Sequence, residues 1–356
     1  MDKAHTILPE NKSDLFDVAI KTVASGTPLR EALDFIISAQ NGALICIGDV
    51  KNILNLGNGG FRIDMPFTPQ RLFELSKMDG AIVLNSDVSQ IVCANFHLNP
   101  DPSSVTFETG MRHRSASRTS SQTEAIVIAI SKRRTQTTIY RNGQGITLEG
   151  DEILFSKGNQ GILALQHAKN TLERSVMRQS LIELDDLITI ADVINLLTRY
   201  TNLINLAGET ERFINFLGKN SGLLRQQLEE IMHGVTDAFL FTIRDYATSS
   251  SERDAKRIAR ALLLLPREEQ SPQNVMALLG FEGEIADEDR LQARGFRVIS
   301  RISVLDEAAT AKIIEEYGSL SAIVSDSKDG FDRLSNIDLD NVRAIAKSFM
   351  QLRNTL

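Results

Sequence analysis

Short apolar runs alternate with a helical pattern over residues 1–150 of the chain. Residues 68–78 have the apolar spacing of a helix and open on Thr68 and Pro69, which form an N-cap and first-turn pair. The strand-like runs are residues 43–48, 81–85, 90–98, 124–130 and 136–140. Segments that alternate in this way predict a mixed α/β fold, with a mixed central sheet flanked by helices.

The pattern changes after residue 150 to long stretches with helical apolar periodicity. These stretches predict packed helices, interrupted by a polar loop at residues 248–257 and ended by an acidic, glycine-containing linker at residues 280–289. We therefore expect three parts. An α/β domain at residues 1–150 is followed by an all-α spine at residues 151–289 and a small all-α C-terminal domain at residues 290–356.

The composition is that of a globular protein, since 42% of the 356 residues are apolar and 24% are charged. A net charge of −7 argues against a surface that binds nucleic acid everywhere, but it allows a local basic patch. Cys46 and Cys93 lie in apolar runs, so we expect reduced core thiols. We expect a cytoplasmic protein, because residues 1–14 lack the apolar core of an export signal and no window has the ~18 apolar residues that span a bilayer.

A basic cluster at residues 109–118 stands out because its arginines repel one another unless an anion lies among them. The cluster contains Arg112, His113, Arg114, Ser115 and Arg118. Thr109 is placed to cap the helix that follows, and Gly110 leaves the first amides of that helix free to face a phosphate. A polyphosphate matches three guanidiniums better than a carboxylate does. The alternative is a solvated helix start, with His113 packed or exposed.

Two shorter motifs have similar chemistry. Asp79, Gly80 and Ala81 lie between the predicted helix and a predicted strand, where a carboxylate is able to hold a hard cation or accept a proton. The alternative is a simple Asp-Gly turn. Ser131 and Lys132 end a buried strand in a basic run, which is either a phosphate contact or a solvated rim.

Taken together, Asp-Gly-Ala at residues 79–81 and Thr-Gly-x-Arg-His-Arg at residues 109–114 resemble the diadenylate cyclase domain. The resemblance extends through GTPLREAL (26–33), GGF (59–61) and NFHLNPDP (95–102). With the helical regions that follow, the whole chain is similar to the DisA-type diadenylate cyclases. In that family a helical linker joins the cyclase domain to a helix-hairpin-helix domain.

The resemblance implies an enzyme that condenses two ATP into cyclic di-AMP and two pyrophosphates, each 3′-hydroxyl attacking the α-phosphate of the other nucleotide. It implies that Asp79 is catalytic and holds Mg²⁺ or Mn²⁺. The implied ATP contacts are Asp79, Gly80, Ala81, Leu98, Thr109, Gly110, Arg112, His113, Arg114, Ser115, Ser131 and Lys132. It also implies an octamer in which cyclase domains face each other, as a two-fold symmetric product requires. The alternative is a DNA-sensing or scaffold protein with a weakly active cyclase domain.

Residues 334–349 have the apolar frame of a helix-hairpin-helix motif but lack its glycines. The frame consists of Leu334, Ile337, Val342 and Ile345. Such motifs contact DNA phosphates through the amides of a Gly-hydrophobic-Gly hairpin. Here Asn336 and Asp338 occupy the glycine positions, and Asp338 adds negative charge. DNA contact through this segment is therefore doubtful, and a packing or protein-binding tail is an equal alternative.

We accordingly predict weak binding of branched or duplex DNA, because the chain is acidic overall and the hairpin amides are obstructed. The double variant Asn336→Gly, Asp338→Gly should bind a labelled four-way junction more tightly in a fluorescence-anisotropy titration at near-physiological salt. Tight, saturable binding by the unaltered chain, without a gain in the double variant, would contradict this interpretation.

Overall fold

The computed structural model describes residues 12–283, 286, 288–302, 305, 307–329 and 347, and these form two compact units. The sheet unit holds the described residues up to Gln160 together with Thr210–Arg225. The helical unit holds Gly161–Glu209 and the described residues from Gln226 onward.

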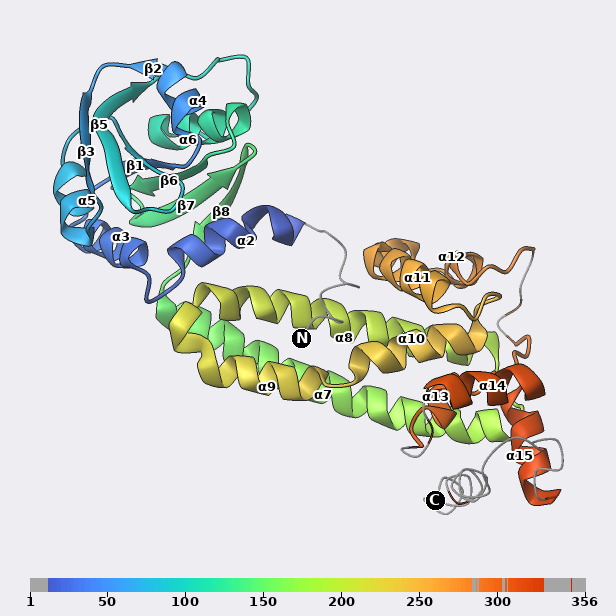
Figure 1. Cartoon of the computed structure of the whole chain (residues 1–356). Helices are drawn as coiled ribbons and strands as arrows, with labels where there is room; N and C mark the ends of the chain where they lie inside the picture. The colour runs from blue at the N-terminus through green and yellow to red at the C-terminus, as the bar shows by residue number, and fades with distance from the viewer. Residues whose placement is uncertain are drawn as a thin grey trace. The chain divides into compact units, whose positions relative to one another are not determined.

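A mixed sheet of eight strands forms the centre of the sheet unit (Figure 1). Its strands are β1 (Ala43–Ile47), β2 (Gly57–Asn58), β3 (Phe61–Pro66), β4 (Ala81–Leu84), β5 (Gln90–Leu98), β6 (Ile126–Ser131), β7 (Gln136–Arg141) and β8 (Gln144–Leu148). Their order is β2-β5-β4-β1-β6-β7-β8, with β3 also paired to β5. The pairing of β1 with β4 is parallel, and the other pairings of this sheet are antiparallel.

The five strand-like runs of the sequence correspond to β1, β4, β5, β6 and β7, so the predicted mixed sheet is confirmed. The sequence pattern missed β2, β3 and β8. These strands are mostly exposed and therefore lack the apolar runs by which a buried strand is found. Strands β1, β4 and β6, by contrast, are buried almost throughout.

Helices cover both faces of the sheet (Figure 1). They are α2 (Lys12–Val23), α3 (Pro28–Ser38), α4 (Val50–Asn55), α5 (Pro69–Leu75) and α6 (Met111–Gln122). The N-cap predicted at Thr68 is confirmed, because its hydroxyl accepts a hydrogen bond from the Arg71 amide at 3.2 Å. Cys46 and Cys93 are buried and unbonded to each other, and burial raises the pKa of the Cys46 thiol to about 12. Both behave as the core thiols that the sequence predicts.

A buried arginine joins α3 to the first turn of α7 (Asp151–Leu184). The Arg30 guanidinium donates to Asp151 Oδ1 at 2.9 Å, to the Glu149 carbonyl at 3.1 Å and to Asp34 at 3.1 Å. Its side chain is 6% exposed, so these bonds give Nε and Nη2 of a buried charge their partners, while the buried Nη1 has none. They explain why the segment GTPLREAL contains an arginine in an otherwise apolar helix face.

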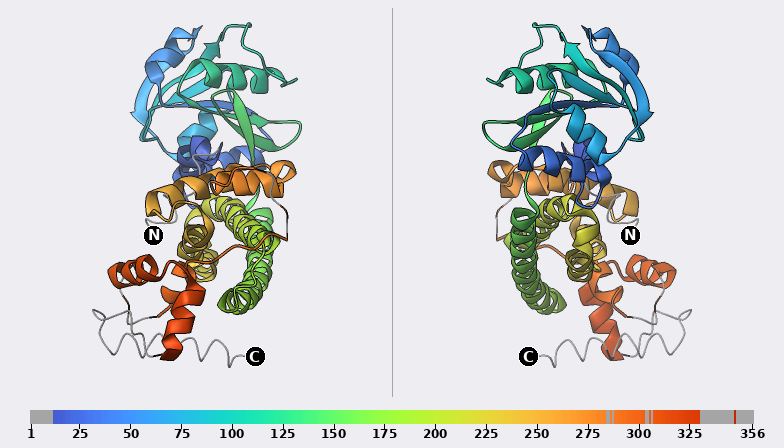
Figure 2. Two further views of the ribbon diagram at one scale, coloured as in Figure 1. Left: turned by 90° about the vertical axis from the view of Figure 1, so that its right-hand side faces the viewer. Right: turned by 90° about the vertical axis from the view of Figure 1, so that its left-hand side faces the viewer.

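The helical unit is all-α in the described residues. The helices that follow α7 are α8 (Ile190–Phe216), α9 (Gly222–Met232), α10 (Val235–Tyr246), α11 (Glu252–Leu264), α12 (Pro272–Leu278), α13 (Phe296–Ile299), α14 (Glu307–Tyr317) and α15 (Leu320–Asp329). The end of α8 and the start of α9 lie within Thr210–Arg225 and so belong to the sheet unit. The long helices α7 and α8 lie side by side in Figures 1 and 2. The predicted all-α character after the sheet is confirmed. The hairpin prediction at Asn336 and Asp338 lies outside the described residues.

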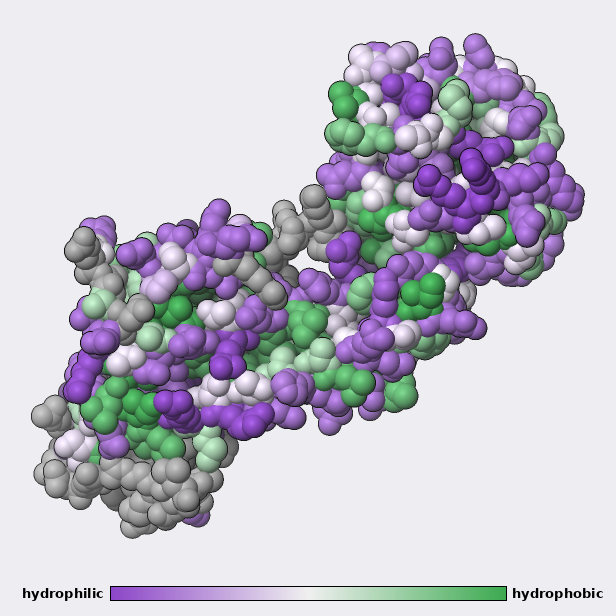
Figure 3. All heavy atoms as spheres, turned by 180° about the vertical axis from the view of Figure 1, so that it is seen from behind, coloured by the Kyte–Doolittle hydropathy of each residue, from purple (hydrophilic) through white to green (hydrophobic). Residues whose placement is uncertain are grey.

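The surface shown in Figure 3 is largely hydrophilic over both units, with apolar side chains in small groups. None of the described helices is long and apolar enough to cross a membrane. Apolar residues of α7 and α8, such as Leu165, Leu172, Leu197 and Leu203, are buried, as expected of helices that pack against other helices.

A buried carboxylate caps α13 in the helical unit. Asp245, at the end of α10, accepts hydrogen bonds from the amides of Gly295 at 2.8 Å, Phe296 at 2.6 Å and Arg297 at 3.1 Å. Capping of this kind satisfies amides that a helix start leaves unpaired. Asp245 thus fixes where α13 begins against α10.

The same cluster contains a buried ion pair. The Arg297 guanidinium bonds to Glu183 of α7 and donates to Ser180 Oγ at 2.9 Å, while Tyr246 donates its hydroxyl to Glu183. Arg297 and Glu183 are 1% and 0% exposed. Glu183 therefore pairs with the guanidinium of Arg297, while Asp245 binds the backbone amide of the same residue, and all three side chains are buried.

This arrangement predicts a pH dependence of stability. Burial, reinforced by the charge of Glu183, raises the pKa of Asp245 to about 7. Because this folded pKa lies above that of the unfolded chain, the stabilisation is complete below about pH 4 and is lost as the pH rises through about 7. The melting temperature should therefore fall from about pH 5 to 8, and fall less in Asp245→Asn, when measured by scanning calorimetry.

The matched control is Asp237→Asn, which alters an exposed carboxylate on the same helix, α10. It should keep the pH dependence of the unaltered protein. An equal pH dependence in Asp245→Asn and Asp237→Asn would contradict the assignment to Asp245.

Candidate functional site

The parallel pairing of β1 with β4 brings together residues that lie far apart in the sequence. Leu44 pairs with Ala81 in parallel register. Gly42 and Asp79 each lie two residues before one member of this pair, so they are neighbours. Asp79 thus lies at the amino end of β4. We call this rim of the sheet the site edge.

Two further strands finish at the site edge. Strand β6 is antiparallel to β1 with Ile130 opposite Ala43, so Ser131 at its end lies beside the start of β1, and Lys132 follows it. Strand β5 is antiparallel to β4 and ends there at Leu98. The register alone therefore collects the Asp-Gly-Ala motif, Leu98 and the Ser-Lys pair.

Helix α6 adds Arg112 to the site edge. A Cβ atom on Gly42 would lie 2.4 Å from Arg112 Nη1, so the guanidinium occupies the space that the missing side chain leaves. Arg112 Nη2 is 3.8 Å from Asp79 Oδ1. The two side chains are 42% and 95% exposed, and an ion pair this open contributes little to stability. Both charges are consequently free to engage a ligand.

Gly80 is required by the close approach of β5. Its φ is +86°, and a Cβ atom there would lie 2.8 Å from the backbone carbon of Asn95. Any larger side chain would clash with this backbone, and residues other than glycine rarely adopt such a φ. Ala81, the next residue, is fully buried. The Asp-Gly-Ala motif therefore combines an exposed carboxylate with a backbone that is fixed by packing.

The start of α6 differs from the sequence prediction. Its N-cap is Gly110, no side chain caps the helix, and the capping role predicted for Thr109 is wrong. The carbonyl oxygen of Thr109 instead accepts a hydrogen bond from Arg114 Nη2 at 3.3 Å. Arg114 Nε donates a second, slightly longer bond to the Glu108 carbonyl at 3.4 Å. The uncapped first turn of α6 leaves a positive end that favours an anion.

His113 belongs to a chain of polar groups that the sequence analysis missed. Its Nδ1 is 2.9 Å from the Tyr140 hydroxyl, which donates to Glu108 Oε1 at 2.7 Å. Tyr140 is 1% exposed, and burial together with Glu108 raises the pKa of its hydroxyl. Glu108 is part of the motif ETGMRHR, so the sequence contained a signal for it. Nothing in the sequence indicated a role for Tyr140 beyond its place in the predicted strand at residues 136–140.

The remaining predicted residues lie near these groups. Ser115 is half-buried on α6, and Leu98 packs against the core cluster beneath the site edge. Ser131 Oγ accepts from the Arg134 amide at 3.2 Å, and Lys132 is exposed. A hydrogen bond from α6 holds the loop that precedes this helix, since Arg118 Nε donates to the Ser104 carbonyl at 3.1 Å.

The donors at the site edge fit a cation only if a ligand supplies part of its coordination. Among the described residues, no group of three or more His, Cys, Asp or Glu side chains is placed to hold a metal ion. Mg²⁺ is commonly bound by one or two carboxylates, water and substrate phosphates. Asp79, with its exposed carboxylate, matches that mode of binding.

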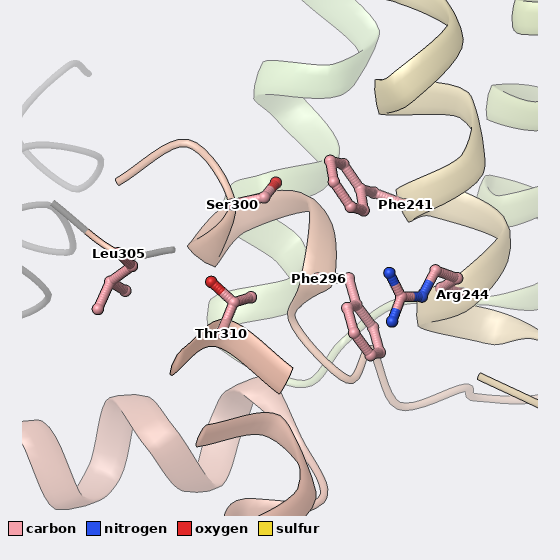
Figure 4. Close-up of a pocket in the computed structure, with 6 residues that line it drawn as sticks. All are labelled: Phe241, Arg244, Phe296, Ser300, Leu305 and Thr310. Atoms are coloured by element: carbon pink, nitrogen blue, oxygen red, sulfur yellow. The ribbon is translucent and has the colours of Figure 1, made fainter. Parts of the chain in front are cut away.

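A pocket in the helical unit contains none of these residues (Figure 4). It is lined by Phe241, Arg244, Phe296, Ser300, Leu305 and Thr310. The Arg244 guanidinium stacks on the Phe296 ring at 3.9 Å, and its Nε donates to the Ser250 carbonyl. Arg244 is thus engaged in packing α10 against α13.

Comparison with known proteins identifies similar sequences over nearly the whole chain. The family model described as DisA bacterial checkpoint controller nucleotide-binding matches residues 30–145, and the DisA linker-region model matches residues 148–287. The DNA integrity scanning protein DisA of Carboxydothermus hydrogenoformans is 36% identical over 96% of this chain and 98% of its own length. The DisA proteins of Symbiobacterium thermophilum and Clostridium botulinum are 37% and 34% identical, over 97% and 98% of both chains respectively.

The contact between Gly42 and Arg112 generates a prediction. Gly42→Ala should displace the Arg112 guanidinium and weaken the binding of inorganic tripolyphosphate by about tenfold, the value of one charge-assisted hydrogen bond. Isothermal titration calorimetry measures this affinity. Gly150→Ala is the control, because a Cβ atom at Gly150 meets nothing within 4 Å. Unchanged affinity in Gly42→Ala would show that the position of Arg112 does not matter for anion binding.

Proposed function

The chain belongs to the DisA family of diadenylate cyclases, and on that premise we propose that its site edge is where two ATP are joined into cyclic di-AMP, with release of two pyrophosphates. One observation carries this proposal. The sheet register and α6 bring Asp79 within 3.8 Å of Arg112, although the two residues are 33 positions apart in the sequence. A carboxylate and a guanidinium in open contact suit a ligand with both cationic and anionic parts, such as a metal triphosphate.

The reaction needs mainly positioning and charge neutralisation. Each 3′-hydroxyl attacks the α-phosphate of the other nucleotide, and a P–O bond to the pyrophosphate breaks on the opposite side. Arg112 and the uncapped first turn of α6 would neutralise the triphosphate. Arg114 would exchange its two long bonds to carbonyl oxygens, at 3.3 and 3.4 Å, for phosphate oxygens. The proposed set of ATP contacts is otherwise the one that the motifs imply.

Asp79 would hold a divalent cation, Mg²⁺ or Mn²⁺, at the same rim. When bound, such a cation neutralises phosphate charge and lowers the pKa of a coordinated hydroxyl. Asp79 itself would orient the attacking 3′-hydroxyl. Its 95% exposure is consistent with a group that acts on a ligand and not in the core.

The symmetry of the product adds a requirement for assembly. Cyclic di-AMP has two equivalent halves, so a domain that holds one ATP would face an identical domain across a two-fold axis. We propose such pairing within an octamer of a cytoplasmic protein. We also propose a division into a cyclase domain at residues 1–150, a linker at 151–289 and a helix-hairpin-helix-like domain at 290–356, where DNA would bind weakly if at all.

The test is incubation of the full chain with ATP and Mn²⁺, followed by chromatographic separation of the products. Asp79→Asn should lower cyclic di-AMP formation by at least about 100-fold, the usual effect of losing a group that acts on the reacting atoms. Because Asp79 is exposed, the variant should keep the oligomeric state and melting temperature of the unaltered protein.

Asp87→Asn is the matched control. It removes an exposed carboxylate in the turn after the opposite end of the same strand, β4, where the side chain bonds to Ser89 of its own turn. Its turnover should equal that of the unaltered protein. Near-normal turnover in Asp79→Asn would remove Asp79 from the mechanism, and no cyclic di-AMP from the unaltered chain would reject the proposed function.

A further inference from the structure

Three side chains from different elements form a continuous polar chain beneath the start of α6. Glu108 lies in the loop before the helix, His113 in its first turn and Tyr140 on β7. The distances are 2.7 Å from Tyr140 to Glu108 and 2.9 Å from Tyr140 to His113. Tyr140 is almost fully buried, so its hydroxyl depends on groups within the protein for hydrogen bonds, and Glu108 and His113 are two of them.

The direction of the bonds determines the protonation of His113. A tyrosine hydroxyl has one proton, and Tyr140 donates it to Glu108, whose ionised carboxylate only accepts. The phenolic oxygen must therefore accept from His113, so Nδ1 carries a proton. Nε2 is then the ring nitrogen whose protonation is free to change.

The other edge of the imidazole lies at the helix start. A Cβ atom on Gly110 would be 3.7 Å from His113 Cδ2, the carbon bonded to Nε2. Gly110 is the uncapped N-cap of α6, where an anion is favoured. A neutral Nε2 has a lone pair and repels a phosphate oxygen, whereas a protonated Nε2 donates to it.

We propose that Glu108 and Tyr140 are positioning residues that orient His113 and stabilise its imidazolium, so that binding of a polyphosphate draws a proton onto Nε2. The step is a simple protonation, with the proton taken from solvent and returned when the polyphosphate leaves. The identification of that polyphosphate with ATP and with the leaving pyrophosphate rests on the proposed function. We call the chain of Glu108, Tyr140 and His113, with the protonation that it supports, the relay; it does not rest on the proposed function.

The charges around His113 explain why the proton arrives with the ligand. Burial is the main cause that lowers the pKa of His113, Arg134 and Arg112 lower it further, and Glu108 opposes them. These groups come from the β6–β7 turn, α6 and the preceding loop, and β7 adds Tyr140. In the free protein His113 is therefore mainly neutral at neutral pH. A polyphosphate brings negative charge that reverses the balance set by the arginines.

A purely structural role is the competing explanation, because the His113 and Tyr140 rings also pack edge to face at 6.1 Å. The two roles differ in proton uptake. If His113 and Tyr140 only pack together, removing the Tyr140 hydroxyl leaves the number of protons taken up with the ligand unchanged. If the relay operates, the same change lowers that number.

The experiment is calorimetric titration of the full chain with inorganic tripolyphosphate near neutral pH, in buffers of different ionisation enthalpy. The variation of the observed enthalpy among buffers gives the protons taken up per site. Uptake attributable to His113 is the difference between the unaltered chain and His113→Gln. Tyr140→Phe and Glu108→Gln should each reduce that difference by at least about half and weaken binding several-fold, because each removes support for the imidazolium.

Tyr200→Phe is the matched control, since Tyr200 is an equally buried tyrosine in the helical unit. It should leave both uptake and affinity unchanged. Glu108→Gln keeps the test decisive if Tyr140→Phe does not fold, because Glu108 lies in a half-exposed loop. Uptake that is the same in the unaltered chain, Glu108→Gln and Tyr140→Phe would overturn the relay.

Assays of cyclic di-AMP formation on the same proteins separate the two proposals. Uptake that depends on Tyr140 or Glu108 in a chain that makes no cyclic di-AMP would support the relay and reject the proposed function. Normal turnover with uptake independent of both residues would support the function and reject the relay.

Discussion

The hydrogen-bonded register of β1 is the constraint on which the candidate site depends. This central strand pairs in parallel with β4 and antiparallel with β6, so the beginning of two strands and the end of a third meet at one rim. Because a strand alternates its faces, a slip of one residue would reverse every side chain of β1 and separate Gly42 from Asp79. The site is therefore set by the same apolar contacts that form the core, although its own side chains are polar and exposed.

The two units use charge in opposite ways. In the helical unit Arg297 and Glu183 are sealed from water, and their bonds fix α13 against α7 and α10. At the site edge Asp79 and Arg112 meet loosely and stay exposed. Between these extremes lies the half-buried chain of Glu108, Tyr140 and His113, which is held by good hydrogen bonds yet reaches the surface at the helix start. Such an intermediate environment allows a group to change protonation when a ligand binds.

Local signals in the sequence predicted much of this structure, and long-range pairing limited the rest. Apolar runs predicted the buried strands, and Thr68 with Pro69 predicted the start of α5. Exposed strands such as β3 gave no such signal. Thr109 satisfied the rule for an N-cap, but its carbonyl bonds Arg114 and the helix begins one residue later. Tyr140 was missed because its partner His113 lies 27 positions away and is brought to it only by the packing of α6 on β7.

A structure of the full chain with Mn²⁺ and 3′-deoxy-ATP, which lacks the attacking hydroxyl, tests the central claim most directly. The account predicts a triphosphate at the site edge, within hydrogen-bonding distance of Arg112 and the first amides of α6, with the metal beside Asp79 and His113 Nε2 facing a phosphate oxygen. A nucleotide bound elsewhere, for example in the pocket beside Phe296, or a triphosphate directed away from Asp79 and Arg112, would contradict it.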